Sequence, residues 1–408
     1  MTRWARAIGT GWVVRDEVPG PSVDEFAEPD AVVAALAEQG ARDTLLAVQH
    51  PHRTPRARAA GLSLAEALPS ARAALDRLRA TAYRPVNDVV AAYRVAGPDG
   101  VAVGVLCLVD PAAVDRKGRS RVRHSEEVYP GVVAERAEVL AALGCATSAA
   151  MLVPVDDGDR LTELVLHTVD AMAEPSVSVG DGGGREHQLW LVGPGPAQDA
   201  LLAEVQRRPL LVADGNHRVA AAAGTPSGLL ALVTAGPELR IGAIHRALVD
   251  TALTTADLAA AWRRLGLVVR ETDDLTAPST PGTVVVRPVA RPADPGLVVE
   301  LPGPEVIDEP PPRLDHALVE RVLVADGLGL DPAGPQLHAL PAGQPAGPGV
   351  DAVLQLAPVP FADVLAVHRQ GRRMPRKSTY FTPKPRGGLL LADLGEDRVS
   401  ADPPDGRR

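Results

Sequence analysis

The chain has 408 residues, of which 46% are hydrophobic, 23% are charged and only 3% are aromatic, and its formal net charge is −9. This length allows two or three domains, and the shortage of aromatic residues means that Ala, Val and Leu must build the core. The acidic balance argues against a general nucleic-acid surface, which needs a basic excess, but leaves room for a local basic pocket. Two cysteines, Cys107 and Cys145, are too few for a disulfide framework or a four-ligand zinc site.

Apolar and flexible segments set further expectations. No apolar run approaches the roughly 20 residues that span a bilayer, and the first residues lack a long apolar signal core. We therefore expect a soluble cytoplasmic protein without a membrane or nucleic-acid partner. The 38 glycines and 39 prolines predict many turns and irregular linkers. From their distribution we expect an α/β core region at residues 1–272, a Pro/Gly-rich connection and C-terminal region at 273–395 that packs back on the core, and a disordered tail at 396–408.

Hydrophobic periodicity predicts the secondary structure along the chain. Thr44 to Val48 reads as a strand, and Leu62 to Ala82 has the longest helical pattern, in which Pro69 predicts a break or kink. We expect further strands at residues 8–14, 101–109, 150–155, 176–179, 187–192, 229–235, 283–286, 296–301 and 353–356, and further helices at 30–39, 132–143, 197–206, 254–265, 315–323 and 361–370.

The middle of the sequence reads as a strand, a tight turn and a helix. Leu210 to Ala213 is a short apolar run typical of a buried strand, and Asp214-Gly215-Asn216 has turn chemistry. Val219 to Ala223 begins a helix of small residues. The N–H groups at the helix start, with His217 and Arg218 in the first turn, favour an anion site. The alternative is a common structural unit whose histidine satisfies a hydrogen bond in the core.

Polar residues near the C-terminus suggest a second contribution to that site. The hydroxyl groups of Ser378 and Thr379 beside Lys377 suit a polar ligand, although the glycines of a Walker A phosphate loop are missing. Clustering Lys377 and Lys384 in an acidic protein is costly unless an anion or carboxylate faces them, so we expect this element to return to the central pocket. His245-Arg246 is a second His-Arg pair that favours a shared pocket. The alternative for the C-terminal element is a basic edge strand.

Two other segments carry histidines next to polar residues. A basic run from Arg116 to Arg123 is followed by His124 and two acidic residues, and it is either part of a site for a phosphorylated ligand or a solvated loop. His187 begins a His-Gln-Leu-Trp segment, and it either enters the pocket or closes a strand edge.

Two motifs resemble those of a known family. Ala213-Asp214-Gly215-Asn216-His217-Arg218-Val219 resembles an Ala-Asp-Gly-His-His-Arg-Tyr element, and residues 374–384 match a Met-Pro-x-Lys-Ser-Thr-Tyr-Phe-x-Pro-Lys element. Both elements are typical of the uncharacterised family catalogued as domain of unknown function 1015, and the resemblance extends from about the first strand to Leu391. The first motif more distantly resembles the ParB/sulfiredoxin-like superfamily, which includes free-serine kinases. Asn216 and Val219 depart from the family pattern. Asn216 also stands where sulfiredoxin has its cysteine, which excludes sulfiredoxin chemistry.

The resemblance implies a fold and two functions. We expect an α/β protein with mixed sheets, built around a ParB/sulfiredoxin-like core unit with additional α+β elements. The first function is a nucleotide-dependent phosphotransferase that uses ATP or ADP and Mg²⁺ on a small hydroxyl compound, with free L-serine as the acceptor to test first. The alternative is a non-enzymatic nucleotide-binding switch or regulatory protein, and a third possibility is a structural or partner-binding protein. The acceptor, the nucleotide and the oligomeric state stay open. The predicted site residues are Asp214 and His217 for catalysis, Asp214 for the metal, and Gly215, Asn216, Arg218, His245, Arg246, Lys377, Ser378 and Thr379 for the cofactor.

Overall fold

The computed structural model describes residues 3–21, 29–38, 43–156, 158–225, 228–236, 239–308 and 310–395. The chain forms two compact units. Unit 1 contains the described residues of 1–124, 128–239 and 383–408, and unit 2 contains those of 125–127 and 240–382. The tail predicted to be disordered lies outside the described residues, and the domain boundaries expected from composition stay a prediction.

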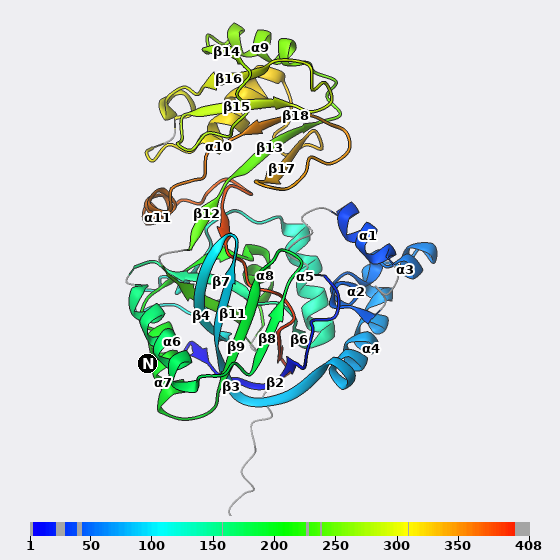
Figure 1. The fold of residues 1–408 in the computed structure, drawn as a ribbon, viewed down its shortest axis with the longest axis vertical. Helices are drawn as coiled ribbons and strands as arrows, with labels where there is room; N and C mark the ends of the chain where they lie inside the picture. Colours follow the sequence, from blue (N-terminus) through cyan, green and yellow to red (C-terminus); the bar gives the residue numbers. More distant parts are fainter. Residues whose placement is uncertain are drawn as a thin grey trace, which may run out of the picture. The chain divides into compact units, whose positions relative to one another are not determined.

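A mixed sheet forms the centre of unit 1 (Figure 1). Its described strands follow the order β5-β10-β7-β11-β4-β3-β2-β20-β6, with β1 paired to β4, and with β9 paired to β3 and β8. The pairs β5–β10 and β7–β11 are parallel, whereas the other pairs are antiparallel. The expected α/β class with mixed sheets is therefore confirmed. The strands are β1 (Ala5–Arg6), β2 (Ile8–Val14), β3 (Tyr83–Gly97), β4 (Gly100–Val109), β5 (Val122–Arg123), β6 (Cys145–Ala146), β7 (Ala150–Pro154), β8 (Val177–Gly180), β9 (Glu186–Val192), β10 (Leu210–Asp214), β11 (Leu229–Ala235) and β20 (Leu390–Asp393).

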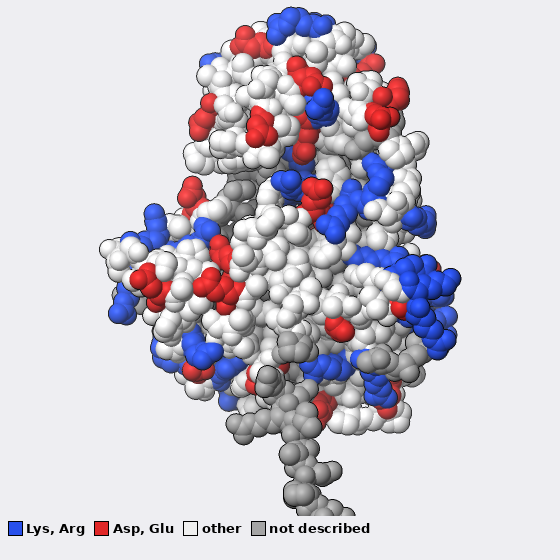
Figure 2. All heavy atoms as spheres, turned by 180° about the vertical axis from the view of Figure 1, so that it is seen from behind, with Lys and Arg blue, Asp and Glu red and all other residues white. Residues whose placement is uncertain are grey.

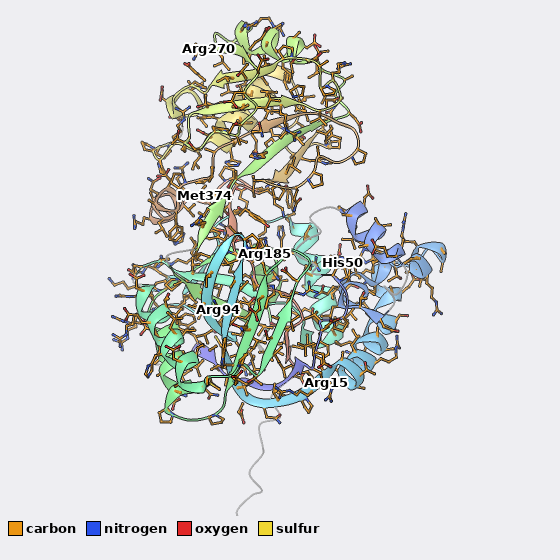
Figure 3. The ribbon with its side chains drawn as sticks, viewed as in Figure 1. Arg15, His50, Arg94, Arg185, Arg270 and Met374 are labelled. Carbon is orange, nitrogen blue, oxygen red and sulfur yellow. The ribbon has the colours of Figure 1, made fainter. Side chains whose placement is uncertain are left out.

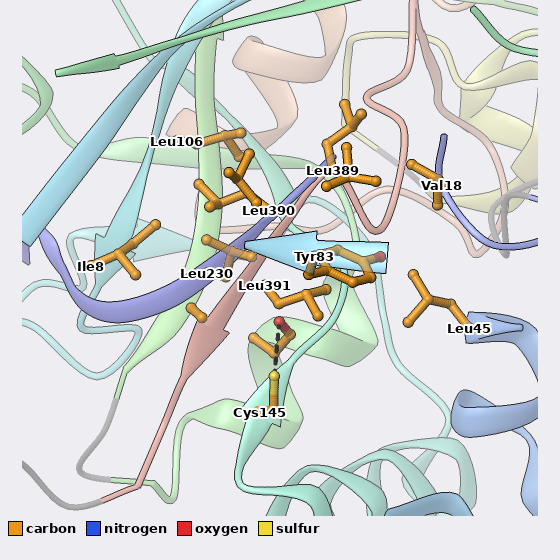
Figure 4. Close-up of a cluster of buried hydrophobic side chains, with 14 of the residues drawn as sticks. Ile8, Val18, Leu45, Tyr83, Leu106, Cys145, Leu230, Leu389, Leu390 and Leu391 are labelled. Atoms are coloured by element: carbon orange, nitrogen blue, oxygen red, sulfur yellow. Dashed lines mark hydrogen bonds between the residues drawn. The ribbon is translucent and has the colours of Figure 1, made fainter. Parts of the chain in front are cut away.

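The long strand β3 pairs with different strands along its two halves. Its first half pairs with β2, and its second half pairs with β4 and β9. Asp88, near the end of the first half, has a positive φ of 50°. Both faces of the sheet are buried, so β4 reads as an almost continuous apolar run whose side chains alternate between two core clusters. Leu106 and Leu108 enter one cluster, which includes Tyr83 and Leu391 (Figure 4), and Cys107 enters the other.

The helices of unit 1 correct two predictions. Thr44 to Val48 is not a strand but the start of helix α2, because the Thr44 hydroxyl accepts a hydrogen bond from the Ala47 N–H and caps the helix. Helix α4 continues through Pro69, so the predicted break is wrong. A capping box between Ser63 and Glu66 fixes its start, and its buried alanines and leucines hold the remainder. The helices are α1 (Pro29–Ala37), α2 (Leu45–Gln49), η3 (Pro51–Arg53), α3 (Pro55–Ala59), α4 (Leu64–Ala82), α5 (Pro130–Leu143), α6 (Asp159–Met172), α7 (Pro196–Val205) and α8 (Asn216–Ala222).

Unit 2 is built on an antiparallel sheet with the strand order β14-β16-β15-β18-β13-β17. Trp262 on α9 is fully buried among leucines and valines, and its ring N–H donates to the Leu323 carbonyl at 2.9 Å. Strand β17 lies within a Pro/Gly-rich segment in which the hydrophobic periodicity predicted no strand. A separate pair, β12 and β19, is antiparallel. The elements are β12 (Arg240–Gly242), β13 (Ile244–Val249), β14 (Val269–Thr272), β15 (Thr283–Pro288), β16 (Gly296–Glu300), β17 (Leu337–Pro341), β18 (Val350–Gln355), β19 (Tyr380–Thr382), α9 (Thr255–Arg264), η4 (Pro304–Ile307), α10 (Asp315–Leu318), η5 (Val319–Asp326) and α11 (Phe361–Arg369).

The surface carries charges of both signs. On the face drawn in Figure 2, acidic and basic side chains are interspersed over unit 2, and basic side chains gather at one place on unit 1. An acidic chain thus still has a locally basic area. None of the helices in the described part of the chain is long and apolar enough to cross a membrane.

Candidate functional site

The predicted strand–turn–helix is present in unit 1. Strand β10 ends at Asp214, Gly215 makes the turn, and α8 begins at Asn216, three residues earlier than the small-residue pattern indicated. Gly215 has a φ of +91°, which L side chains rarely adopt. A Cβ there would also lie 2.7 Å from Nε of Arg218. Glycine is therefore required both for the turn and for the position of the arginine.

The Asp214 carboxylate is shared by two cations. Nη2 of Arg218 donates to its Oδ2, and Nζ of Lys384 donates to its Oδ1 at 2.6 Å. The first contact is an i, i+4 pair within the strand–turn–helix, whereas Lys384 comes from the segment that leads to β20. All three side chains are partly exposed, between 18% and 21%. The Asp214 cluster (Asp214, Arg218 and Lys384) thus has one more positive than negative charge and is in contact with solvent.

Two histidines flank this cluster. The Tyr129 N–H donates to Nε2 of His217 at 3.0 Å, and the two rings stack 5.8 Å apart at an angle of 4°. Because Nε2 accepts this bond, His217 carries its proton on Nδ1 when neutral. On the other side, Nδ1 of His124 lies 3.1 Å from Oδ1 of Asn216, which is buried. Of these flanking residues, the sequence analysis gave His217 and Asn216 a role in the site, while Tyr129 was missed.

A buried chain of hydrogen bonds explains His187. Its Nδ1 lies 2.7 Å from the Tyr93 hydroxyl, its Nε2 lies 3.0 Å from Asp181, and the Arg386 N–H donates to the Tyr93 oxygen at 3.3 Å. Burial lowers the pKa of His187. Burial by itself would raise the pKa of Asp181, but contacts to the imidazole and to backbone N–H groups together outweigh it and lower that pKa to about 2. A neutral His187 therefore donates to the carboxylate and accepts from Tyr93. His187 lies on β9, which pairs with β3 on one side and with β8 on the other, so it does not close a strand edge. Its entry into the pocket stays a prediction. Figure 3 shows Arg185, which pairs with the same Asp181.

The second His-Arg pair lies in unit 2 and is engaged there. Arg246 is 3% exposed and donates to Glu320 through Nε and Nη2 at 2.9 and 2.6 Å. It also donates to the carbonyl oxygens of Arg376 and Lys377, both at 3.0 Å. Nδ1 of His245 accepts the Leu356 N–H at 3.1 Å, and burial lowers the pKa of this histidine. Arg246 therefore holds the loop that contains Lys377, while His245 holds the backbone just after β18.

That loop binds a carboxylate of unit 2. The N–H groups of Lys377, Ser378 and Thr379 donate to the Glu126 carboxylate at 3.0, 3.2 and 2.9 Å, and the Thr379 hydroxyl adds a fourth bond. Lys377 has a φ of 50°, and a left-handed residue in such a loop lets successive N–H groups converge on one anion. Ser378 is fully buried, and its hydroxyl donates to the Pro375 carbonyl at 2.7 Å. The sequence analysis noted the acidic pair after His124 but missed this role of Glu126.

Residues 87–286 match the model of a family described as protein of unknown function (DUF1015). This stretch belongs to the DUF1015 family. The family predicted from the two motifs is thereby confirmed. The DUF1015 match includes the Asp214 turn and the His245-Arg246 pair, while the Met-Pro-Arg-Lys-Ser element lies beyond residue 286.

Solved structures give weaker similarities. A free serine kinase in complex with AMP is 12% identical, with 66% of this chain and 89% of that chain covered and a TM-score of 0.36. A conserved hypothetical protein from Pyrococcus furiosus is 11% identical, with 67% and 92% covered and a TM-score of 0.36. SbnI from Staphylococcus aureus, truncated at its C-terminus, is 13% identical, with 72% and 90% covered and a TM-score of 0.39. With TM-scores below 0.5, these likenesses carry no conclusion about this chain. A search of curated proteins finds no match.

The predicted site residues divide between the units. Residues 214–218 lie together in unit 1, and His245, Arg246, Lys377, Ser378 and Thr379 lie in unit 2. The catalytic and cofactor-binding roles of both groups stay predictions. In the described part of the chain no group of three or more His, Cys, Asp or Glu side chains is arranged to hold a metal ion. Mg²⁺ commonly uses only one or two carboxylates plus substrate phosphates, so the Asp214 carboxylate suits it as a single ligand.

Proposed function

We propose that unit 1 binds the phosphate groups of a nucleotide at the Asp214 cluster, and that the protein transfers a phosphoryl group to a small hydroxyl compound. The observation that carries this proposal is the contact of Arg218 and Lys384 with one carboxylate. Two cations from distant segments stand at the end of a strand, beside a glycine turn, with their side chains partly open to solvent. This arrangement suits an incoming polyanion.

The energies favour exchange of the carboxylate for phosphate. Ion pairs of partly exposed side chains contribute about 0–1 kcal/mol each, so little is lost when Asp214 releases Arg218 and Lys384. Charge-assisted hydrogen bonds from the same cations to a phosphate contribute about 1.5–3 kcal/mol. The forked guanidinium of Arg218 matches phosphate geometry, while Lys384 acts as a point charge. Helix α8 has only two turns, so we assign its dipole a secondary part.

The released carboxylate supplies the remaining chemistry. Once Arg218 and Lys384 hold phosphate oxygens, Asp214 is able to accept the proton of an acceptor hydroxyl or to contact Mg²⁺. Mg²⁺ bound with the nucleotide would neutralise charge on the transferred group. The stacked ring of Tyr129 and its N–H group fix the orientation of His217. We therefore assign His217 to positioning phosphate groups or the acceptor.

A screen of nucleotides and acceptors tests the proposal. The full chain is incubated with Mg²⁺ and ATP, ADP or CTP, with and without small hydroxyl compounds, beginning with L-serine. We expect nucleotide consumption that requires the acceptor, together with a phosphorylated product detected by mass spectrometry. Asp214→Asn should abolish product formation and leave nucleotide binding in place.

Two other outcomes identify the alternatives. Nucleotide binding without acceptor-dependent turnover would replace the phosphotransferase by a nucleotide-binding switch. The absence of any nucleotide-induced rise in melting temperature would refute both and leave a structural role for the Asp214 cluster. A ligand that binds only the native state must raise its stability, so this second result is decisive.

A further inference from the structure

A second polar cluster lies in unit 1, away from the residues predicted for the site. Helix α2 ends at Gln49, and the chain continues through His50 into the short helix η3, which carries His52 and Arg53. Helix α5 contributes Arg136, whose Nη2 lies 3.5 Å from Nε2 of His50. Figure 3 shows His50 beside α5. We call these five residues the His50 cluster.

The protonation of His50 follows from its neighbour. A guanidinium group only donates hydrogen bonds, so Nε2 of His50 must accept from Arg136, and the proton lies on Nδ1. This Nδ1 is buried, and it has no hydrogen-bond partner among the described residues. Burial, followed by the charges of Arg136 and Arg53, lowers the pKa of His50 to about 3. At neutral pH His50 is therefore a neutral donor that has no acceptor within the described part of the chain.

Three neighbouring side chains share this condition. Nδ1 of His52 and Nε of Arg53 are also buried without a partner in the described part of the chain. Gln49 is 5% exposed, and its Nε2 donates to the Thr147 hydroxyl at 2.6 Å, while its Oε1 has no partner among the same residues. Buried polar groups in native proteins are nearly always hydrogen-bonded, so several unsatisfied groups in one place indicate a ligand or bound solvent.

The charges indicate which ligand fits. The charges of Arg136 and Arg53 both lower the pKa of His50, and Glu135 raises the pKa of His52 against the effect of burial. The five side chains of the cluster thus include two arginines and no carboxylate. The histidine and arginine donors of the cluster suit an oxyanion as the acceptor. The Oε1 of Gln49 is an acceptor and suits a hydroxyl or ammonium donor on the same molecule.

We propose that the His50 cluster binds a small organic oxyanion, a carboxylate or a phosphate ester, that also carries a hydroxyl or ammonium group. Its position adds a further consequence, which rests on the proposed function. Tyr129, whose ring stacks on His217, is the N-cap residue of α5, and Arg136 lies seven residues later in that helix. At the rise per residue of a helix, the two positions are about 10 Å apart along the axis. In this proposal the ligand of the His50 cluster is the acceptor of the phosphotransfer.

Calorimetric titration of the full chain without nucleotide tests the binding site by itself. The probes are inorganic phosphate, L-lactate, L-serine and 1,2-propanediol, in which a hydroxymethyl group replaces the carboxylate of lactate. We expect saturable binding of one or more of the oxyanions and none of the diol. Binding of phosphate alone would identify the phosphate ester as the ligand class, and binding of lactate or serine the carboxylate.

Matched variants connect the binding to the cluster. Arg53→Gln and Arg136→Gln should each weaken the oxyanion at least tenfold, while Arg56→Gln, at an exposed arginine three residues from Arg53, should leave the affinity unchanged. Circular dichroism confirms that each variant is folded. Absence of oxyanion binding, or binding that neither cluster variant changes, overturns the proposal. The titration contains no nucleotide, so its result stays valid if the protein proves not to be a phosphotransferase. If Arg53→Gln leaves acceptor-dependent turnover unchanged, only the assignment of this ligand as the acceptor is refuted.

Discussion

Replacement of Arg218 by lysine is the most direct test of the phosphate site. In the free protein the guanidinium contacts Asp214 as an i, i+4 pair, with side chains 19% and 21% exposed. A pair of this kind contributes about 1 kcal/mol or less, and lysine keeps the charge, so the loss of stability without ligand should be at most about 1 kcal/mol. For a unit of 150–250 residues this corresponds to a fall of roughly 2–4 °C in melting temperature.

The effect on the nucleotide should be larger. Lysine cannot reproduce the forked contact of a guanidinium with phosphate. Loss of a charge-assisted hydrogen bond costs about 1.5–3 kcal/mol, which corresponds to a roughly 10- to 100-fold weaker Kd. Thermal melts of wild type and Arg218→Lys, with and without Mg-nucleotide, separate the two effects. Calorimetric titration then gives the ratio of affinities.

A matched control and a clear refutation accompany this experiment. Arg119 forms an i, i+4 pair with Asp115 outside the Asp214 cluster, so Arg119→Lys makes the same chemical change without touching the site. It should leave the ligand-induced shift intact. If Arg218→Lys lowers the melting temperature without ligand but leaves that shift unchanged, then Arg218 is a structural partner of Asp214. The phosphate site and the phosphotransferase would both have to be abandoned.

Three further substitutions test the surroundings. Tyr93→Phe removes the partner of Nδ1 of His187, and urea denaturation should show a loss of about 1–3 kcal/mol; an unchanged midpoint would contradict the hydrogen-bonded chain. Gly215→Ala should lower stability by about 1 kcal/mol or more and also weaken nucleotide binding, because its Cβ would displace Arg218; normal affinity would count against that geometry. Burial lowers the pKa of His316 from 6.5 to about 3, so the native state stays neutral while the unfolded state gains a proton. The free energy of unfolding that depends on a neutral His316 is fully present above pH 6.5 and falls by about 1.4 kcal/mol per pH unit toward pH 3. His316→Asn should therefore make the free energy of unfolding, measured by denaturation at several pH values, depend less steeply on pH in this range. An unchanged dependence would refute the assignment of a buried neutral His316.

Local patterns predicted the local structure well where packing and sequence agree. The apolar run at Leu210 and the glycine turn after it predicted β10 and α8, because a buried strand and a left-handed turn need those residues wherever they occur. The same reasoning failed at Thr44 to Val48. A short apolar run is compatible with either a strand or a helix, and the cap formed by Thr44 decided for the helix.

The site was less predictable because its partners come from distant segments. Asp214 and Arg218 lie in one motif, and Lys384 is 170 residues away along the chain. The clustering of basic residues led us to expect Lys384 to face an anion or carboxylate, but the sequence did not indicate that this carboxylate is Asp214. The C-terminal element that seemed continuous is divided, since its residues up to Thr382 belong to unit 2 and those from Pro383 onward to unit 1. Sequence spacing alone contains no signal for such a division.

The His50 cluster was missed for a different reason. Its basic stretch before Arg56 reads as a turn, and turns of this composition are usually exposed. The available signal was the adjacency of Gln49, His50 and His52, three side chains with both donors and acceptors. Whether such groups lack hydrogen-bond partners depends on whether they are buried, and this depends on the packing of α5, which the sequence does not show.

The state of Asp214 constrains the order of events in the proposed reaction. In the free protein both of its oxygens accept hydrogen bonds from cations, so neither is open to an acceptor hydroxyl. It becomes able to accept a proton only after Arg218 and Lys384 have turned to another anion. The nucleotide must therefore bind before Asp214 acts on an acceptor. When an acceptor meets the protein without nucleotide, Asp214 is still paired with Arg218 and Lys384 and does not take the proton of the acceptor hydroxyl. The same two cations thus hold Asp214 in the free protein and hold the phosphate groups in the proposed complex.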